Sequence, residues 1–569
     1  MDKLYPVYTL KNECHDCYKC VRNCHVKAIK IENGHASIIP DKCIACGGCV
    51  QICPSGAKKI RDDIEKVKNL IRAQKKVFVS LAPSWKGAFN IKSSQIITAL
   101  KFLGFAGISE TALGAQEVSI ETAKILNNAP SGLYISSACP VVVDFIRYYI
   151  NDLAPNITPI ASPALTHAKM LKEIYGEDIS VVFIGPCIGK KNESDYHQEL
   201  IDVSITFDEL SRWFVEDGIE LHNIVENNET FIPESAYEGA LYPLEGGMNE
   251  TIKKCGIPAN VQLLSISSLE NIEKALKNLD IKNLKHPVFI ETLACDNGCI
   301  AGPAIKKDTS SILIASDIIS QTKERTIPKV PKTVVEIEYS KVPHPQKTYP
   351  IEQILEALKK IGKHSIEDEL NCGGCGYDTC RELAQALIEG EAETSMCVSY
   401  MRKIAMRKAA AMLRCMPSAI VMVDNSLNII EANDSFMKMF SGELYEVFAN
   451  RQDGMLGAAI DRLVPFSEIF KTAIKTGKDI HKERYSVEDK LYDITAFTIE
   501  PNQIVGAIIT DVTKTEMRRD QIAKKAQEVI EKNISIVQNI ACLLGEHMVD
   551  TELLLSSIAE GFDSEEDKK

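Results

Sequence analysis

The chain has 569 residues, enough for several domains with separate hydrophobic cores. Its 65 Lys and Arg residues face 78 Asp and Glu residues, and the formal charge of −13 argues against nucleic acid or an anionic membrane as the main partner. No run of about 18 apolar residues is present, and residues 1–11 lack the apolar segment of a signal peptide, so we expect a cytoplasmic protein with no membrane partner. Most of the 19 cysteines are then expected to bind iron or zinc rather than to form disulfides.

Two similar cysteine runs occupy residues 12–56. They are Cys14, Cys17, Cys20, Cys24 and Cys43, Cys46, Cys49, Cys53, with the same spacing in both. This double run is typical of bacterial two-cluster ferredoxins, in which the fourth cysteine of each run ligates the other cluster. One 4Fe–4S cube is therefore expected on Cys14, Cys17, Cys20 and Cys53, and the other on Cys43, Cys46, Cys49 and Cys24. Zinc is the alternative, although zinc sites rarely stack three cysteines at a spacing of three.

Residues 61–76 have the pattern of a charged amphipathic helix, and an α/β region follows from Val77 to about Ile327. Short apolar runs alternate there with helical patterns such as Ile91–Leu103 and Thr166–Tyr175. This alternation is typical of crossover units and a parallel sheet. Strands are expected at Val77–Ser84, Leu133–Ser136, Val181–Ile184 and Val288–Thr292.

Four cysteines follow the last three of these runs: Cys139, Cys187, Cys295 and Cys299. Open α/β sheets bind ligands at the carboxyl ends of their strands, so these loops are expected to meet. Four thiolates on loops flanked by proline and glycine indicate a metal cluster. The alternative is that they are inert buried cysteines, because free cysteine is among the most buried residue types.

Three segments around these cysteines resemble, in order, the cluster motifs of the iron-only (FeFe) hydrogenases. They are Ser-Ser-Ala-Cys-Pro at 136–140, Pro-Cys-Ile-Gly-Lys-Lys-Asn-Glu at 186–193 and Glu-Thr-Leu-Ala-Cys-Asp-Asn-Gly-Cys at 291–299. The resemblance covers roughly residues 1–327. It implies a two-lobed α/β catalytic domain with an H-cluster, in which a 4Fe–4S cube is joined to a diiron subsite carrying CO, cyanide and an azadithiolate.

Carried over residue by residue, the resemblance gives each motif residue a role. Cys139, Cys187, Cys295 and Cys299 would hold the cube, and Cys299 would bridge to the diiron subsite. Lys190 would donate to a cyanide, since an ammonium is a compact donor for a small buried anion. Glu193 would either support these residues or begin a helix, and Lys191 is expected to be a solvated surface lysine.

The departures from the family pattern point to its sensory branches. Catalytic members carry a proton-relaying cysteine where this chain has Ala138, and Gly185 and Leu293 replace methionines near the diiron site. A methyl group cannot carry a proton, so slow turnover is expected. Candidate relay carboxylates are Glu117, Glu121 and Glu245, although a solvated surface explains them equally well.

A third cysteine set follows a proline-rich stretch at 328–350, which predicts a linker or an extended crossover, and a helix expected at Ile351–Gly362. Its members are Cys372, Cys375, Cys380 and Cys397. The set resembles the small 4Fe–4S domain of corrinoid iron–sulfur proteins and electron-transport subunits. Zinc is the alternative, because four-cysteine sites also bind zinc.

Residues 408–512 resemble a PAS sensor domain, with strands expected at Ala419–Val423, Tyr492–Thr498 and Gln503–Thr510. Nothing in the sequence selects a PAS cofactor, and we expect His481 and Cys415 to be ordinary residues. The last helix has heptad core positions spaced alternately by four and three residues: Ile522, Ala526, Val529, Asn533, Ile536, Ile540 and Leu543. All of them are apolar except Asn533, a single polar core position of the kind that fixes register. The spacing predicts either a coiled coil, and with it a homodimer, or a helix packed on the PAS domain.

Together these features predict a multidomain α/β and α+β chain. Its parts are a two-cluster ferredoxin module (1–60), an H-cluster domain (61–327), a linker (328–350), a 4Fe–4S domain (351–407), a PAS domain (408–512) and a signalling helix with a tail (513–569).

The predicted function is that of a sensory hydrogenase from an anaerobe. It would slowly and reversibly split H2 into protons and electrons, exchange electrons with a partner such as ferredoxin, and signal to a kinase or phosphatase. The alternatives are an electron-transfer or iron–sulfur assembly protein without a diiron subsite, and a scaffold whose clusters only stabilise the fold.

Overall fold

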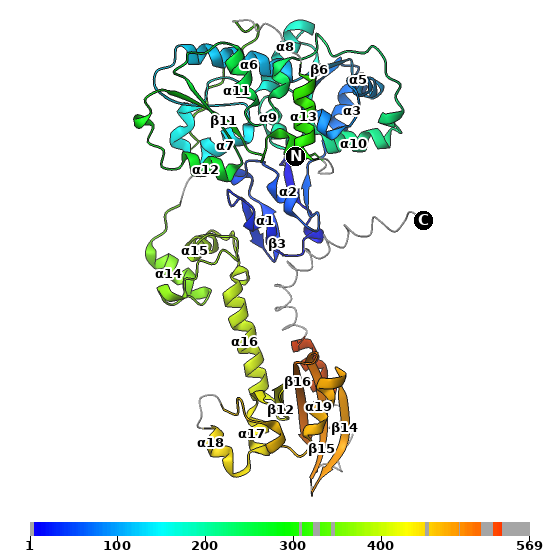
Figure 1. Cartoon of the computed structure of the whole chain (residues 1–569), viewed down its shortest axis with the longest axis vertical. Coiled ribbons are helices and arrows are strands. Elements are labelled where there is room, and N and C mark those ends of the chain that lie inside the picture. Colours follow the sequence, from blue (N-terminus) through cyan, green and yellow to red (C-terminus); the bar gives the residue numbers. More distant parts are fainter. Residues whose placement is uncertain are drawn as a thin grey trace. The chain divides into compact units, whose positions relative to one another are not determined.

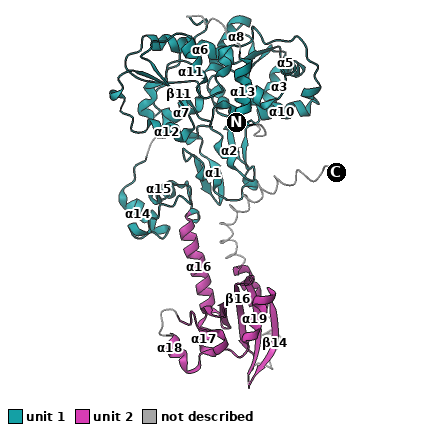
Figure 2. Cartoon of the chain, viewed as in Figure 1, with its two compact units in different colours: residues 1–396 teal, residues 397–569 magenta. Residues whose placement is uncertain are grey.

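The computed structural model describes residues 5–305, 310–322, 330–342, 347–449, 454–488, 490–513 and 527–537. The chain forms two compact units, residues 1–396 and 397–569 (Figure 2). Among the described helices, none combines the length and the apolar character needed to cross a lipid bilayer.

The first unit begins with a small module of paired short strands. β1 (Val7–Thr9) pairs with β4 (Lys58–Ile60), and β2 (Ile29–Glu32) pairs with β3 (His35–Ile38), both antiparallel. The two cysteine runs lie between these strands, and each includes a short helix, α1 (Lys19–Arg22) or α2 (Gly48–Ile52). Each helix follows a residue with positive φ, Tyr18 or Gly47. The repeated sequence pattern therefore folds into repeated local structure.

Two parallel sheets form the centre of residues 77–293. The first has the strand order β6-β5-β8-β9 and the second β10-β11-β7. Their strands are β5 (Val77–Leu81), β6 (Gly107–Glu110), β7 (Gly132–Ile135), β8 (Ser180–Gly185), β9 (Val203–Thr206), β10 (Gln262–Ser267) and β11 (Pro287–Leu293). All pairings are parallel. The four strands predicted in this region are confirmed as β5, β7, β8 and β11.

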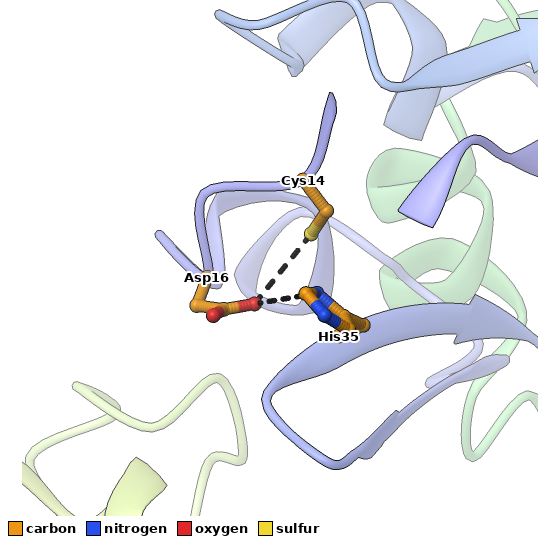
Figure 3. A group of neighbouring side chains, drawn as sticks. All are labelled: Cys14, Asp16 and His35. Atoms are coloured by element: carbon orange, nitrogen blue, oxygen red, sulfur yellow. Dashed lines mark hydrogen bonds and ion pairs between the residues drawn. The ribbon is translucent and has the colours of Figure 1, made fainter. Parts of the chain in front are cut away.

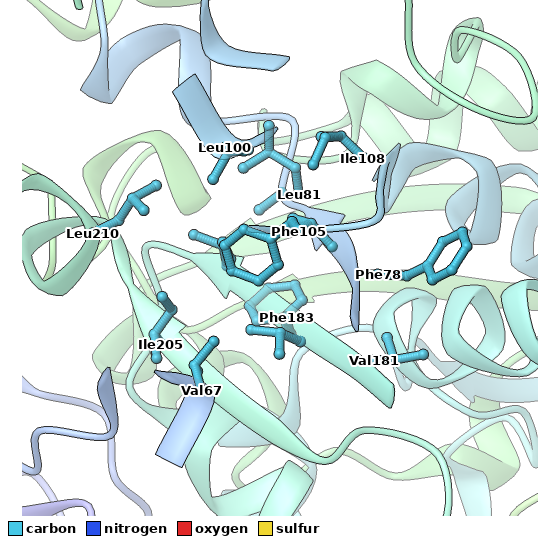
Figure 4. Close-up of a cluster of buried hydrophobic side chains, with 14 of the residues drawn as sticks. Val67, Phe78, Leu81, Leu100, Phe105, Ile108, Val181, Phe183, Ile205 and Leu210 are labelled. Atoms are coloured by element: carbon cyan, nitrogen blue, oxygen red, sulfur yellow. The ribbon is translucent and has the colours of Figure 1, made fainter. Parts of the chain in front are cut away.

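Helices cover each sheet separately (Figure 1). The core of the first sheet includes side chains of α3 (Ile64–Arg72), α5 (Ser93–Phe102), α8 (Pro163–Tyr175) and α10 (Phe207–Glu216). Figure 4 shows part of this core, where Phe105 and Phe183 lie among aliphatic side chains. The second sheet packs against α7 (Pro140–Tyr149) and α12 (Leu269–Leu276). The predicted helices at 61–76, 91–103 and 166–175 correspond to α3, α5 and α8.

A nearly fully buried helix, α6 (Ala112–Asn127), contacts α8 and α11 (Gly247–Lys254). At its contact with α8, a Cβ atom on Gly114 would lie only 2.3 Å from the carbonyl oxygen of Pro163. Nearby, the imidazole of His167 in α8 bridges Ser80 of β5 and Ser109 of β6, both at 2.8 Å. Burial lowers the pKa of His167 to about 3, so this histidine is a neutral structural bridge.

The described part of the expected linker, residues 330–342, lies along the first unit. The amide of Ala161 donates to Val335 O at 2.8 Å, and the amide of Ile337 donates to Pro159 O at 3.3 Å. The stretch is therefore extended and packed. It follows α13 (Ser311–Gln321), and α14 (Ile351–Lys360) and α15 (Cys380–Glu389) complete the elements of this unit.

The second unit contains the long helix α16 (Val398–Cys415) and a five-stranded antiparallel sheet in the order β13-β12-β16-β15-β14. The strands are β12 (Ala419–Asp424), β13 (Ile429–Ala432), β14 (Ile480–Val487), β15 (Lys490–Glu500) and β16 (Ile504–Asp511). Phe436 of α17 (Asp434–Phe440) and Phe470 of α19 (Ser467–Thr476) fill the core beside the sheet. A further short helix, α18, spans Tyr445–Ala449.

The three strands predicted in this region are confirmed as β12, β15 and β16. The sequence analysis did not predict β13, β14 or α16, and α16 continues across the boundary expected at 407/408. Of the predicted coiled-coil positions, Val529, Asn533 and Ile536 are half-buried in a helical stretch at 527–537. The others, Ile522, Ala526, Ile540 and Leu543, lie outside the described residues.

Candidate metal centres

Three loops carry cysteines away from the carboxyl ends of parallel strands. Cys187 follows β8 in the first sheet, whereas Cys139 follows β7 and Cys295 follows β11 in the second sheet. The loops thus belong to both sheets, as expected for ligand-binding loops of parallel α/β structure.

The fourth cysteine depends on a glycine turn. Cys299 begins a short 3-10 helix directly after Gly298, whose φ is +90°. A Cβ atom at Gly298 would lie 2.3 Å from the carbonyl oxygen of Pro243. Both the dihedral angle and the close approach require glycine, so this turn fixes where Cys299 points.

A cavity of about 100 Å³ lies where these loops meet, and Cys139, Cys187 and Cys299 line it. Cys295 lies within electrostatic reach of all three. The rest of the lining is mostly apolar and includes Ala82, Pro83, Ala112, Ala115, Ala138, Pro163, Phe183, Leu293 and Met248, together with the charged residues Lys190 and Glu291. The four predicted ligand residues are thus brought together at or beside one cavity with a mostly apolar lining.

Burial determines the protonation of these thiols. Desolvation raises the pKa of Cys187 to about 12, and the nearby Cys139 raises it while Lys190 lowers it. Burial also raises the pKa of Cys295 and of Cys299, and the neighbouring thiols raise both further. Because burial and the neighbouring thiols both disfavour the charged form, four adjacent thiolates can exist here only with a cationic centre that compensates their charge. Thiolate sulfur is the ligand that iron–sulfur clusters use. The donor set fits such a cluster.

Lys190 reaches this cavity from α9 (Gly189–Tyr196), the helix that follows Cys187. Its ammonium donates to Ser162 Oγ at 2.8 Å and to Glu193 Oε2 at 2.6 Å, and its side chain is 9% exposed. An ammonium has three donors, so these two contacts leave one for a group in the cavity. Glu193 lies within α9 rather than at its start, where it holds Lys190 in place.

Ala138 also lines the cavity, and its amide donates to Ser136 Oγ at 3.2 Å. A methyl group therefore occupies the position beside Cys139 where a proton-carrying side chain would face the same space.

Glu291 lines the cavity. It is the first residue of the third hydrogenase-like motif, but the sequence alone predicted no role for it. It lies in β11, and its carboxylate accepts from the amides of Met248 and Asn249 at 3.2 Å each. Burial raises its pKa to about 7, although those two amides lower it. Glu291 can therefore gain or lose a proton near neutral pH. An acidic residue inside an otherwise apolar strand was the signal that could have revealed it.

The three relay carboxylates predicted from sequence lie in different surroundings. Glu117 and Glu121 are buried at 5% and 8% exposure, so a solvated helix face is the wrong explanation for them. Glu117 instead accepts from the amides of Lys332 and Thr333, which anchors the extended stretch at 330–342. Glu245 is exposed and accepts from Ser267 Oγ at 2.5 Å. Among the described residues that line the cavity, none of these three is included.

The prediction that Lys191 is a solvated surface residue is wrong. Its side chain is fully buried, and its ammonium lies 2.8 Å from Asp63 Oδ2 and 2.8 Å from Glu209 Oε1. Asp63 also pairs with Arg61 at 2.9 Å, and Arg61 pairs with Asp195 of α9 at 2.7 Å. This buried ion cluster ties the start of α3 to α9 and α10. It thereby fixes the helix that carries Lys190.

The ferredoxin-like module gathers its cysteines into two groups. Cys20 lies within electrostatic reach of Cys14, Cys17 and Cys53, and these four line one small cavity. Cys49 lies within reach of Cys43, Cys46 and Cys24. The two groups have the composition expected from crossed ligation.

Two polar residues border the first group. Cys14 Sγ lies 3.7 Å from Asp16 Oδ1, and His35 Nδ1 lies 3.5 Å from the same oxygen (Figure 3). These three residues could together hold a metal ion. Because Cys14 already belongs to the first cysteine group, Asp16 and His35 are better described as neighbours of that site than as a separate one.

The third cysteine set begins in the first unit. Cys372 is exposed, whereas Cys375 and Cys380 are buried. The side chain of Asn371 accepts from the amide of Cys380 at 2.8 Å and so fixes the turn before α15. Cys397 is buried and is the first residue of the second unit.

Comparison with known proteins agrees with these features. Residues 75–303 match the sequence model of the iron only hydrogenase large subunit, C-terminal domain. Residues 75–303 therefore belong to the iron-only hydrogenase family. Residues 6–54 match a 4Fe-4S dicluster domain, and residues 368–399 match a model of an Fe-S cluster domain.

Relatives of the iron-only hydrogenase region and of the ferredoxin module are distant. The chain is 24% identical over 325 residues to the NADP-reducing hydrogenase subunit HndD of Solidesulfovibrio fructosivorans, and this match covers 46% of the chain and 55% of HndD. The chain thus spans about half the length of HndD. An uncharacterized ferredoxin of Methanocaldococcus jannaschii is 37% identical over 49 residues, which are 8% of the chain and 79% of that ferredoxin.

Among solved structures, a single-residue variant of the FeFe hydrogenase HydA1 of Chlamydomonas reinhardtii aligns with a TM-score of 0.39 at 18% identity. The alignment covers 49% of the chain and 99% of HydA1.

Proposed function

We propose that this chain is a sensory hydrogenase that binds H2 and slowly and reversibly splits it into two protons and two electrons. Residues 61–327 would form its H-cluster domain and residues 1–60 its ferredoxin module. Residues 351–407 would form a further 4Fe–4S domain, residues 408–512 a PAS domain and residues 513–569 a signalling helix and tail. The five-stranded antiparallel sheet of the second unit supports the PAS assignment.

The observation that carries the proposal is the convergence of three thiols and one ammonium at a single cavity, with a fourth thiol, that of Cys295, close to the other three. Cys139, Cys187, Cys295 and Cys299 would hold a 4Fe–4S cube, and Cys299 would bridge to a diiron subsite with CO, cyanide and azadithiolate ligands. The third donor of Lys190 is positioned to bind a small anionic ligand of that subsite. When bound, the diiron group would supply a Lewis-acidic open site for H2.

The residues around the cavity set the rate and the route of protons. The methyl side chain of Ala138 cannot accept a proton, so this chain has no proton-carrying side chain at the position beside Cys139. Glu291 faces the same cavity and titrates near neutral pH, which suits a general acid or base. A proton path through this carboxylate would be less direct, in keeping with slow turnover.

Electrons would leave through the ferredoxin module toward a soluble redox partner such as ferredoxin. A sensor needs only enough turnover to report the gas, and the PAS domain would pass the redox state to a signalling partner, a kinase or phosphatase. The last helix would support a homodimer.

The direct test is to mature the protein with a diiron subsite and to mix it with H2 and a viologen dye. We expect slow, H2-dependent dye reduction. If fully loaded protein reduces no dye at any concentration, the proposal is wrong.

A second candidate is an electron-transfer or iron–sulfur assembly protein that never carries the diiron subsite. Ala138 favours it, because a protein without hydrogenase chemistry has no need of a proton relay. Lys190 argues against it, because an ammonium held in a cavity beside four thiols has no evident purpose in simple electron transfer.

A further inference from the structure

The small domain around α14 and α15 is docked on the ferredoxin-like module by two sets of contacts. In the first set, Lys42 Nζ lies 3.0 Å from Glu389 Oε2 and 2.8 Å from Glu391. The three side chains are 25%, 17% and 18% exposed, so this is a partly desolvated ion-pair group. The amide of Ile31 also donates to the carbonyl oxygen of Glu391 at 2.8 Å. These contacts join the end of α15 to the residue that directly precedes Cys43.

The second set lies at the loop that carries Cys375. Lys27 Nζ donates to Gly376 O at 2.7 Å, and Arg22 donates to Gly374 O at 3.4 Å. Gly376 has φ +95°, and a Cβ atom there would lie 2.9 Å from Val21 Cγ1 and 3.0 Å from the amide nitrogen of Arg22. Only glycine permits this approach, which places the cysteine loop directly on α1.

One tyrosine lies between the two cysteine sets at this interface. Tyr377 is 5% exposed, and its hydroxyl lies within electrostatic reach of both Cys375 and Cys24. The docking thus brings the small domain beside the second ferredoxin group, Cys24, Cys43, Cys46 and Cys49.

The second ferredoxin group also lies near the cysteines of the proposed H-cluster site. Cys46 lies within electrostatic reach of Cys295. A Cβ atom on Gly47 would lie 2.7 Å from both Ile188 and Pro303, which shows how tightly the module packs on the catalytic loops. The first ferredoxin group, by contrast, includes Cys17, which is exposed to solvent.

We propose that the second ferredoxin group is a branch point for electrons. One exit leads to the first group and its exposed Cys17, which suits a soluble one-electron carrier. The other exit leads across the Lys42–Glu389–Glu391 interface to the Cys372–Cys380 site, which directly precedes the second unit in the chain. Each transfer moves one electron, so the donor site is oxidised by one unit as the acceptor site is reduced by one.

The branch rests on the proposed function for its source of electrons, but its geometry can be tested without H2. The full chain is reconstituted with iron and sulfide only, reduced with dithionite, and examined by pulsed EPR for spin coupling between the small-domain cluster and a ferredoxin cluster. Cys375→Ser identifies the small-domain signal by removing it. We expect clear coupling in the unaltered chain.

The double variant Glu389→Lys, Glu391→Lys places like charges around Lys42 and should abolish most of the coupling while iron content is retained. Adding Lys42→Glu restores ion pairs of reversed sign and should restore the coupling. The matched control is Glu226→Lys, Glu229→Lys, which makes the same charge change at exposed ion pairs with Lys92 and Lys101 and should leave the coupling intact. The branch is refuted if coupling is absent in the unaltered chain, if it survives in the double variant, or if Lys42→Glu fails to restore it.

A second measurement uses protein with demonstrated H2 activity. After rapid freezing under H2, the small-domain signal should appear at least tenfold more slowly in the Glu389→Lys, Glu391→Lys variant, with viologen reduction unchanged. Equal rates would overturn the branch. An inactive protein would count against the proposed function alone, because the EPR coupling still decides the branch.

Discussion

At the scale of single residues, two buried charges beside the cysteine loops are compensated in different ways. Lys191 forms ion pairs with the carboxylates of Asp63 and Glu209, each at 2.8 Å. Glu291 has only backbone amides, so burial brings its ionisation close to neutral pH. The first arrangement suits a rigid support, and the second suits a group that exchanges protons.

The support can be tested with Lys191→Met. The substitution removes the buried ion pair of Glu209 and one of the cationic partners of Asp63, which keeps Arg61. We expect the region of the two parallel sheets to lose ~3–5 kcal/mol of stability. Denaturant unfolding followed by the fluorescence of Trp85 and Trp213 reports this region, since both are buried in its core. As a control, Lys101→Met removes an exposed ion pair with Glu229 and should cost less than ~1 kcal/mol. Equal effects of the two substitutions would contradict the role of Lys191.

Glu291 predicts a pH dependence of stability. Between about pH 4.5 and about pH 7 the unfolded chain has lost this proton while the folded chain retains it, so the free energy of unfolding falls by up to ~3 kcal/mol as pH rises. In Glu291→Gln this decline should disappear. The same fluorescence-detected unfolding at pH 5 and pH 8 measures the difference, and an identical pH profile for both proteins would rule out the raised pKa.

Ala138 predicts a gain of function. Ala138→Cys restores a proton-carrying side chain at the cavity, and general acid–base groups typically contribute about 10²–10⁴-fold. We expect H2-driven dye reduction to rise at least tenfold in fully loaded protein. An unchanged rate at equal iron and diiron loading would mean that proton transfer at this position does not limit turnover.

The burial of Lys191 is a property that the sequence did not predict. Lys190 and Lys191 are adjacent and chemically identical, and only acidic partners far away in the sequence decide that Lys191 is buried. These acidic partners come into contact with Lys191 only when α3, α9 and α10 pack together in the folded chain. The two cysteine runs at 14–24 and 43–53 needed no such knowledge, because their spacing is local and repeated.

At the scale of elements, helix α6 depends on the absence of a side chain at Gly114. A methyl group there would collide with Pro163 O and His167 Cβ, at 2.3 and 2.7 Å. Gly114→Ala should therefore destabilise the region of the two parallel sheets by ~1–3 kcal/mol, despite the better helix propensity of alanine. The exposed substitution Lys124→Ala on the same helix is the control and should change stability by less than ~0.5 kcal/mol. A stabilising effect of Gly114→Ala would show that the two helices are not in close contact.

The predicted elements were those with a clear apolar pattern. β8 and β11 are buried at every residue and stand out as short apolar runs. β14 was missed because most of its side chains are exposed, including the charged stretch at 482–484. α16 was missed because none of its residues is buried, so it presents no apolar face. Its many Ala, Met, Lys and Arg residues favour a helix by propensity instead.

At the scale of the whole molecule, the cysteine groups are distributed over both compact units. Three cysteine groups lie in the first unit, and the fourth set begins there and ends at Cys397, the first residue of the second unit. Cysteine spacing and the three hydrogenase-like motifs predicted these sets, but they could not place the sets relative to one another. The ion pairs of Lys42 and the glycine loop at Gly376 do so for the first unit, and neither is recognisable as an interface in the sequence.

The central claim is that the cavity lined by Cys139, Cys187 and Cys299 holds a diiron subsite that reacts with H2. Infrared spectroscopy of the matured protein, recorded under argon and then under H2, tests it most directly. We expect bands of CO and cyanide bound to iron that shift when H2 replaces argon. A protein that carries all its 4Fe–4S clusters after maturation but shows no such bands would contradict it.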